Sequence, residues 1–348
     1  MNSSHLHVYT LEQNQKWDEI VKSFNDYDVY YLSGYAEAFK LNKDGEPLLF
    51  YYEDNDLKAI NVVMKRDISD DKHFSFLEKN KYFDFATPYG YGGWLVEGES
   101  SLTNLFNEYK DWCIKNDIIS EVIRFHPILD NQKEVDSFYD VMAVGNTIKI
   151  DTTSEEEIWN NFSSKNRNVI RKAIKNNVVI KHALNDELMS SFKDIYKQTM
   201  DKDSADSYYY FDDDFYESIM HDLNNNAEIF YAEYDEKIIA ASIILTCNNR
   251  INYHLSGSVR EYSSLAATNL LLSEISKWGA NNGYTTFHLG GGVGAKHDSL
   301  YSFKKSFNRN DDLAYCIGKL VFNKDKYDEL VSYRKEELRE DYFPLYRS

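Results

Sequence analysis

Helical and strand periods of hydrophobic residues alternate along this 348-residue chain, and a similar order of elements occurs twice. The first half contains helical segments, a strand hairpin, a helix and a strand, and it ends near residue 129. From residue 146 a strand, helices, a strand meander, a helix and a strand follow. Chains with this alternation bury their apolar faces as β-sheets covered by helices. The sequence therefore predicts a mixed α/β protein, with central mixed β-sheets flanked by helices in two copies of one unit. Residues 130–144 are predicted to connect the copies.

The expected elements are defined by their apolar periods, turn residues and capping residues. Strands are predicted at residues 5–11, 47–52, 57–65, 82–86, 120–125, 146–150, 178–182, 228–234, 238–246, 251–257, 285–289 and 314–322. Helices are predicted at residues 11–24, 33–39, 102–115, 154–162, 163–176, 186–200, 213–223, 266–282 and 324–339. This division gives domains at residues 1–144 and 145–315, followed by a C-terminal strand and helix at residues 316–348.

The charge distribution restricts the possible partners. The chain has 57 acidic and 39 basic residues, and its formal net charge of −18 argues against non-specific binding to DNA or to anionic membranes. Two segments nevertheless contain no Asp or Glu, one between Glu157 and Asp186 and one between Asp298 and Asp311. Their basic residues are Lys165, Arg167, Arg171, Lys172, Lys175, Lys181, Lys304, Lys305 and Arg309. We interpret these two basic segments as the walls of an anion-binding site.

The sequence predicts a cytoplasmic protein. Its N-terminal residues show neither a basic region nor an apolar region of a secretory signal. The longest apolar run, residues 238–245, is too short to span a bilayer. Cys113, Cys247 and Cys316 match no disulfide or zinc spacing. We expect no integral membrane segment, no metal site and no tightly bound cofactor.

The predicted helix at residues 163–176 carries a basic face. Arg167, Arg171 and Lys175 are four residues apart and share one side of the helix, and Lys165 lies in its first turn. No acidic residue stands at i±4, so the charges on this face repel one another unless an anion is bound. Because the guanidinium fork fits phosphate and carboxylate, Arg167, Arg171 and Lys165 are candidate substrate-binding residues. The alternative is an ordinary solvated face.

Two further groups carry potential chemistry. Gly290, Gly291 and Gly292 follow a strand and mark a sharp turn or a close approach of the backbone, although they match no phosphate-loop pattern. His254 lies in the strand at residues 251–257 and is a candidate general base, with a structural histidine as the alternative.

Several segments resemble the Fem group of peptidoglycan-bridge aminoacyltransferases, which belongs to the GNAT acetyltransferase superfamily and includes BioF2-like proteins. In the second half the similar segments include SSKNRNVIRKAIKNNVVI and LYSFKKSF. The complete set comprises residues 82–93, 124–129, 163–180, 231–245, 252–291 and 300–307. The resemblance covers nearly the whole chain.

This resemblance implies two tandem GNAT-like domains, with the C-terminal helix packing back on the first. It also implies transfer of an acyl or aminoacyl group to an amine, with aminoacyl-tRNA and a nucleotide- or lipid-linked muropeptide as substrates of the peptidoglycan members. The position matching Arg167 or Arg171 is expected near the phosphates of the acceptor. The lysine of the Phe303-Lys304 pair is expected to stabilise the oxyanion that forms during transfer.

Two departures from the family pattern concern the donor. Acetyl-CoA enzymes carry an R/Q-x-x-G-x-G/A loop before the helix that follows the fourth strand, whereas residues 260–265 here contain no glycine. The long helical arm of some Fem proteins is also missing, because only a short loop separates Gly257 from Ala266.

We therefore predict an acyltransferase that forms an amide bond on a phosphorylated cell-envelope precursor of peptidoglycan or polysaccharide. The donor, used as a co-substrate, is an aminoacyl-tRNA or an acyl-CoA-type thioester. Lys304 is the expected oxyanion cation, and the expected pocket-lining or substrate-binding residues are Tyr89, Tyr253, Asn269, Gly291 and Lys305. One alternative is an acetyl-CoA-dependent N-acetyltransferase of an amino sugar, and another is a non-catalytic carbohydrate- or RNA-binding module.

Overall fold

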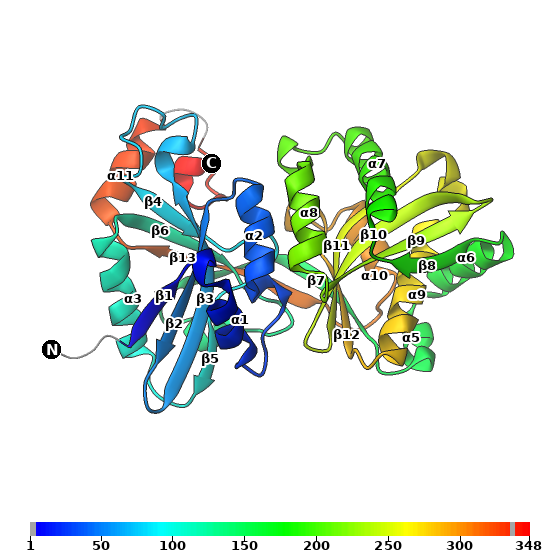
Figure 1. The fold of residues 1–348 in the computed structure, drawn as a ribbon, viewed down its shortest axis with the longest axis horizontal. Coiled ribbons are helices and arrows are strands. Elements are labelled where there is room, and N and C mark those ends of the chain that lie inside the picture. The colour runs from blue at the N-terminus through cyan, green and yellow to red at the C-terminus, as the bar shows by residue number, and fades with distance from the viewer. Residues whose placement is uncertain (1–4, 335–337) are drawn as a thin grey trace. The chain divides into compact units, whose positions relative to one another are not determined.

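The computed structural model of the protein describes residues 5–334 and 338–348 (Figure 1). The chain divides into two compact units. The first combines Met1–Val144 with Tyr315–Ser348, and the second is Gly145–Ala314. Each unit contains β-strands and packed helices, so the predicted mixed α/β fold class is confirmed.

The first unit has a sheet in the order β1-β2-β3-β4-β6-β13, with β5 paired to β3. Strand β4 runs parallel to β6, and the pairs formed by β1, β2, β3, β5 and β13 in this unit are antiparallel. The strands are β1 (Leu6–Tyr9), β2 (Glu46–Glu53), β3 (Leu57–Asp67), β4 (Phe83–Ala86), β5 (Leu95–Gly98), β6 (Ile118–Arg124) and β13 (Leu313–Val321). The helices are α1 (Asn14–Lys22), α2 (Ser33–Leu41), α3 (Thr103–Lys115), α4 (Gln132–Val135) and α11 (Lys324–Tyr333).

A buried carboxyl group lies inside the core of the first unit. Glu121 accepts hydrogen bonds from Asn61 Nδ2 at 3.0 Å, from Tyr109 OH at 2.9 Å and from Tyr139 OH at 2.8 Å. Burial raises the pKa of Glu121 to about 7, although these three donors act in the opposite direction. The group therefore titrates near neutral pH inside an apolar core.

The C-terminal residues are fixed in the first unit by a second buried carboxylate. Asp84 accepts hydrogen bonds from Arg66 Nε at 2.7 Å, from Tyr346 OH at 2.9 Å and from Arg347 Nε at 2.5 Å. Burial alone would raise the pKa of Asp84, but Arg347 and Arg66 hold it below its usual value. Because Asp84 lies on β4, these bonds attach the end of the chain to the sheet.

The second unit has a sheet in the order β7-β12-β11-β10-β9-β8, in which β11 and β12 are parallel. The other adjacent pairs are antiparallel. The strands are β7 (Asp140–Asp151), β8 (Val179–Ala183), β9 (Ala227–Tyr234), β10 (Lys237–Cys247), β11 (Arg250–Ser258) and β12 (Thr286–Gly290). The helices are α5 (Glu155–Asn161), α6 (Ser164–Lys175), α7 (Asp186–Asp203), α8 (Asp213–Asp222), α9 (Ala267–Asn281) and α10 (Ser299–Lys305).

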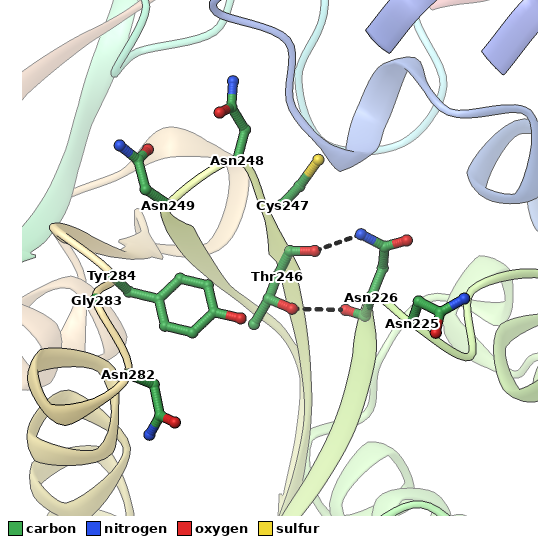
Figure 2. Close-up of a pocket in the computed structure, with 9 residues that line it drawn as sticks. All are labelled: Asn225, Asn226, Thr246, Cys247, Asn248, Asn249, Asn282, Gly283 and Tyr284. Carbon is green, nitrogen blue, oxygen red and sulfur yellow. Dashed lines mark hydrogen bonds between the residues drawn. The ribbon is translucent and has the colours of Figure 1, made fainter. Parts of the chain in front are cut away.

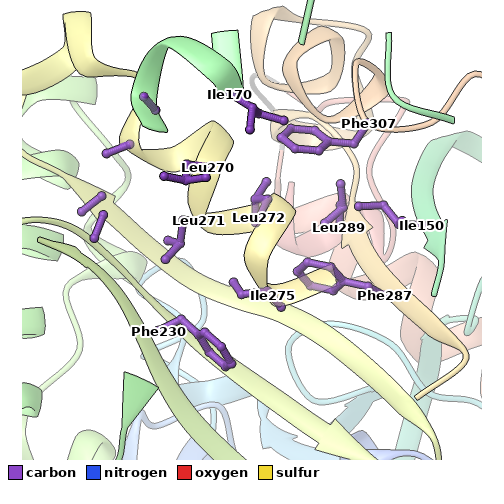
Figure 3. Close-up of a cluster of buried hydrophobic side chains, with 14 of the residues drawn as sticks. Ile150, Ile170, Phe230, Leu270, Leu271, Leu272, Ile275, Phe287, Leu289 and Phe307 are labelled. Carbon is purple, nitrogen blue, oxygen red and sulfur yellow. The ribbon is translucent and has the colours of Figure 1, made fainter. Parts of the chain in front are cut away.

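Helices cover both faces of this second sheet. Helix α7 packs on β10 and β11, and α9 packs on β9 and β10 from the other side, where it also contacts α5 and α6 (Figure 1). The apolar residues of α9 point into one cluster with residues of β7, β9, β12 and α6 (Figure 3). Burial of this leucine-rich face explains why α9 forms although no side chain caps its N-terminus.

Side-chain caps begin three other helices of this unit. Ser154, Ser163 and Asn185 accept hydrogen bonds from backbone N–H groups at the starts of α5, α6 and α7. Ser154 and Glu157 have the S-x-x-E spacing of a capping box. The Ser154 hydroxyl accepts from the N–H group of Glu157, and the Glu157 carboxylate accepts from the hydroxyl of Thr153.

Two segments differ in detail from the expected elements. Residues 130–144, predicted to connect the two copies, contain α4 and the first residues of β7. Since the start of β7 is largely exposed, its apolar period is weak. The final helix ends at Tyr333 rather than at residue 339, and residues 335–337 of the predicted helix lie outside the described residues. The short strand β5 was not predicted.

No helix within residues 5–334 and 338–348 is both long enough and apolar enough to cross a bilayer.

Candidate active site

The sheet of the second unit opens between its two parallel strands. Strands β11 and β12 pair only through Arg250–Thr286, Ile251–Phe287 and Asn252–His288. Beyond these pairs β11 continues to Ser258, and β12 ends at Gly290. In open α/β sheets, ligands bind beyond the carboxyl ends of strands, where neighbouring strands diverge and expose backbone polar groups. The end of β12 is therefore the expected position of an active site in this sheet.

A β-bulge in β11 lies beside this opening. Ile243 of β10 pairs with Leu255 and Ile244 pairs with Tyr253, so His254 is the extra residue. Burial lowers the pKa of His254 to about 3. The imidazole is consequently neutral and only a weak base at neutral pH.

The glycine segment turns the chain sharply after β12. Gly290 has a φ of 72°, which favours glycine, and a Cβ atom on Gly291 would lie 2.6 Å from the carbonyl oxygen of Asn146. The backbone of this turn thus packs directly against the backbone of β7. This contact fixes the position of the Gly291 carbonyl group.

Lys304 lies at this turn. Its side chain is on α10 with 8% of the residue exposed, and Nζ donates a hydrogen bond to the carbonyl oxygen of Gly291 at 2.7 Å. Nζ also lies 5.8 Å from the ring centroid of Tyr253. Burial lowers the pKa of Lys304 to about 8, and the charge of Asp298 acts in the opposite direction. The ring of Phe303 packs against Phe307 of the core at 5.4 Å, which anchors α10.

Lys305, the next residue, is directed to other partners. Its Nζ donates to the carbonyl oxygen of Asn310 at 2.6 Å and forms an ion pair with Asp312. Asp312 also accepts a hydrogen bond from Tyr301 OH. The structure therefore brings Lys304, Gly291 and Tyr253 together and places Lys305 in a separate cluster.

Asn269 belongs to a hydrogen-bonded junction of three helices. Its Nδ2 donates to Oδ1 of the buried Asn166 at 2.8 Å, and Asn166 Nδ2 donates to the carbonyl oxygen of Ser306 at 3.4 Å. The backbone N–H of Ser163 donates to the same carbonyl at 2.9 Å. This junction holds the starts of α6 and α9 at the end of α10, two residues after Lys304. Asn166 was not singled out in the sequence, where it looked like one more polar residue of a basic helix.

The basic face of α6 is divided between two roles. Arg167 Nη1 donates to the carbonyl oxygens of Trp159, Asn160 and Phe162, at 3.2, 3.3 and 2.7 Å, and so caps the end of α5. Arg171 stacks 5.1 Å from the ring centroid of Trp159.

The lysines of this segment differ in their partners. Lys165, Lys172 and Lys175 are exposed, and within the described part of the chain none of them forms an ion pair. Lys181 pairs with Glu233 at 2.7 Å. Arg171 and these three lysines therefore carry positive charge that no ion pair of the described residues neutralises, while the charge of Arg167 is directed at backbone carbonyl groups.

Tyr89 and His126 lie in the first unit. The ring of Tyr89 stacks on Phe39, and its backbone carbonyl accepts a hydrogen bond from Tyr35 OH at 2.7 Å. His126 Nε2 lies 3.1 Å from Asp28 Oδ2, a pairing that sequence spacing does not reveal. His126 Nδ1 accepts from backbone N–H groups of residues 128 and 129, so both ring nitrogens have structural partners.

A surface hollow of about 340 Å³ lies at the other ends of these strands, and its lining residues are shown in Figure 2. Five asparagines contribute to its wall, but they occupy turns and helix ends. Asn248 and Asn249 have positive φ angles in the β10–β11 turn, and Asn226 Nδ2 and Asn282 Nδ2 donate to backbone carbonyls. Turn geometry explains this composition, so we do not assign chemistry to it.

The described residues contain no cluster of three or more His, Cys, Asp or Glu side chains suited to a metal ion.

The second unit is similar to a known family of domains. Residues 164–305, which include α6, the β11–β12 opening and Lys304, match the family model described as an acetyltransferase (GNAT) domain. A search of the curated proteins found no match to the chain.

Three solved structures are similar to nearly the whole chain. FemX is 15% identical with a TM-score of 0.67, and the match covers 93% of this chain and 99% of FemX. The C-terminal domain of a putative lysylphosphatidylglycerol synthetase from Agrobacterium fabrum is 11% identical with a TM-score of 0.56, covering 90% and 92%. A conserved protein of unknown function from Bacteroides thetaiotaomicron is 8% identical with a TM-score of 0.60, covering 92% and 100%. At these identities the likeness concerns the fold alone, and the family model identifies residues 164–305 of the second unit as an acetyltransferase (GNAT) domain.

Proposed function

We propose that the chain transfers an acyl or aminoacyl group to an amine of a phosphorylated cell-envelope precursor and forms an amide bond. The observation that carries this proposal is the buried ammonium of Lys304 at the end of β12, next to the opening between β11 and β12. An amine in its neutral form attacks the acyl carbonyl, and negative charge develops on the carbonyl oxygen. Collapse of this tetrahedral intermediate breaks the bond to the leaving group, which is the tRNA hydroxyl of an ester or the thiol of a thioester, and that group departs with a proton from the attacking amine. Lys304 Nζ already donates to Gly291, and its other N–H groups can donate to this oxygen.

The phosphate of the precursor is assigned to the basic face of α6. Arg171, Lys165, Lys172 and Lys175 supply positive charge that no carboxylate of the described residues neutralises. Arg167 contributes by fixing α5 against α6, since its Nη1 is bound to three carbonyl groups. Asn269 acts through the junction that holds α6 to α10.

The donor is proposed to be an aminoacyl ester such as aminoacyl-tRNA. The loop before α9 supports this choice, because Arg260–Leu265 forms a 3-10 helix. The backbone N–H groups of Tyr262 and Ala266 donate to carbonyls of the loop and are not directed at a pyrophosphate. Similarity to FemX and to a lysylphosphatidylglycerol synthetase domain points in the same direction.

Acetyl-CoA-dependent acetylation of an amino sugar is the second candidate, favoured by the acetyltransferase description of the matching family model. Both reactions place the protein where charged tRNA or acyl-CoA is made, which is the cytoplasm.

The test is a pair of reactions analysed by mass spectrometry. In one, the chain is incubated with a mixture of isotopically labelled aminoacyl-tRNAs and a UDP-linked muropeptide. In the other, it is incubated with acetyl-CoA and amino sugars, and thiol release is recorded. A labelled amide in the first reaction supports the proposal, and thiol release with an acetylated sugar supports the second candidate. Absence of a product from both reactions, with a sugar or RNA co-purifying with the chain, would favour a binding module without catalysis.

A further inference from the structure

Asp298 connects the glycine turn to the helix that carries Lys304. Its Oδ2 accepts a hydrogen bond from the backbone N–H of Val293 at 2.9 Å, and its Oδ1 accepts one from the N–H of Tyr301 at 2.8 Å. The first bond holds the turn after Gly292, and the second caps the N-terminus of α10. One carboxylate therefore fixes both segments between which Lys304 and Gly291 form their hydrogen bond.

Asp298 is also the carboxylate whose charge acts on Lys304. From β11 the neighbouring group is the ring of Tyr253, whose pKa is raised by burial, so that the phenol is uncharged at physiological pH. From the end of β12 the neighbour is the uncharged Gly291 carbonyl. Asp312 is engaged with Lys305 and with Tyr301 OH. A buried ammonium with one nearby carboxylate depends on that carboxylate to keep its proton.

We propose that Asp298 is a positioning residue of the acyl-transfer site, which ties the glycine turn to α10 and keeps the Lys304 ammonium charged and directed at the Gly291 end of β12. This inference rests on the proposed role of Lys304. Asp298 itself need not touch the substrate. Its carboxylate acts through the turn, the helix cap and the lysine.

The variant Asp298→Asn separates charge from capping. Asparagine is about as good an N-cap as aspartate, so Oδ1 can still accept the Tyr301 N–H and α10 is retained. The negative charge is lost, and an amide NH₂ group replaces the Oδ2 atom that accepts the Val293 N–H. Asp312→Asn is the matched control, since it removes a carboxylate that contacts the same helix but faces Lys305.

The primary measurement is the protonation midpoint of Lys304 in the intact chain, obtained by competitive labelling with trace isotopic acetic anhydride and peptide mass spectrometry across pH. We expect a wild-type midpoint of about 8. In Asp298→Asn it should fall by about one pH unit, which is a tenfold change in proton affinity. Asp312→Asn should leave it within about 0.3 units. A Lys304 midpoint that is unchanged in Asp298→Asn would overturn the inference.

A kinetic measurement distinguishes this inference from the proposed function. With an active substrate pair, Asp298→Asn should lower kcat with little change in KM and should move the basic limb of the kcat–pH profile to lower pH. Asp298→Glu, which restores the charge, should return that limb toward its wild-type position. If the Lys304 midpoint shifts in Asp298→Asn but Lys304→Met keeps full acyl-transfer activity, Asp298 still positions Lys304 and the proposed chemistry is wrong.

Discussion

Replacing Lys304 by methionine should make the protein more stable and less active at the same time. The folded-state pKa of Lys304 is about 8, against an ordinary value of 10.5, because the ammonium is buried. This difference of about 2.5 pH units corresponds to a cost of about 3 kcal/mol for holding the charge in the folded protein. Methionine has a similar length and no charge, so the substitution removes that cost.

The gain is partly offset at Gly291. The carbonyl oxygen that accepts from Lys304 Nζ at 2.7 Å loses its donor in the variant, which costs about 1 kcal/mol. The net stabilisation at pH 7 is therefore about 2 kcal/mol, or a rise of about 4 to 8 °C in the Tm of a unit of this size. Activity should change in the opposite direction, since loss of one oxyanion donor lowers kcat by about 100- to 1000-fold.

The pH dependence identifies the cause. The unfolded chain keeps the lysine proton up to about pH 10.5, whereas the folded chain releases it near pH 8. The cost of the buried charge is thus fully present below pH 8 and disappears as the pH rises toward 10.5. Thermal unfolding of Lys304→Met and wild type should differ most at pH 7 and converge near pH 10.

Lys305→Met is the comparison variant, because Lys305 forms a partly exposed ion pair with Asp312 and should change stability by less than about 1 kcal/mol. A Lys304→Met protein that unfolds at a lower temperature at pH 7 would refute the reasoning about the buried charge. A raised KM with unchanged kcat would instead assign Lys304 to substrate docking.

Three further predictions concern other residues. Arg171→Ala should weaken binding of a UDP-linked muropeptide about tenfold in calorimetry at low ionic strength, and less so in high salt. Lys181→Ala, which removes a lysine already paired with Glu233, should not weaken it. Equal affinities of the two variants would make the α6 face ordinary solvated surface. The pKa of Glu121 is raised to about 7, so its favourable contribution to the free energy of unfolding is complete below about pH 4.5 and is lost as the pH rises to 7. Urea unfolding of the wild type should show a loss of about 3 kcal/mol over this pH range, and the loss should disappear in Glu121→Gln. Tyr346→Phe removes the hydroxyl that donates to Asp84 and should lower the free energy of unfolding by about 1 to 3 kcal/mol in the same assay; no change would mean that the two arginines suffice.

Most of the fold could be predicted because apolar periods report burial, and burial is what most strands and helices of this chain share. The long strands β2, β3, β10 and β11 were identified for this reason. Strand β5 has only four residues, and the start of β7 is exposed, so neither gives a period to detect. The end of α11 was placed too late because charged helix-forming residues follow Tyr333.

The site was less predictable, because sequence spacing gives the direction of a side chain but not its partner. Arg167 and Arg171 are four residues apart on one helix face, and yet Arg167 reaches back to the end of α5. It does so because only two residues separate α5 from α6, which puts unsatisfied carbonyls within reach of the second helix. Asp298 could have been found, since an aspartate placed before a helical segment is a capping signal.

Nearby aspartates determine which lysine of the second basic segment, Lys304 or Lys305, is buried at the end of β12. Adjacent residues on a helix point about 100° apart, so the sequence predicts that one lysine at most faces a given pocket, but not which one. Asp312 lies just beyond the acid-free segment and pairs with Lys305, while Asp298, just before it, caps the helix and acts on Lys304. Asp312 therefore neutralises a partly exposed lysine, whereas the charge of Asp298 favours a buried ammonium. The second basic segment thus supplies a single buried positive charge at the end of β12 and not a broad anion-binding surface. A single fixed charge is what stabilisation of one oxyanion requires.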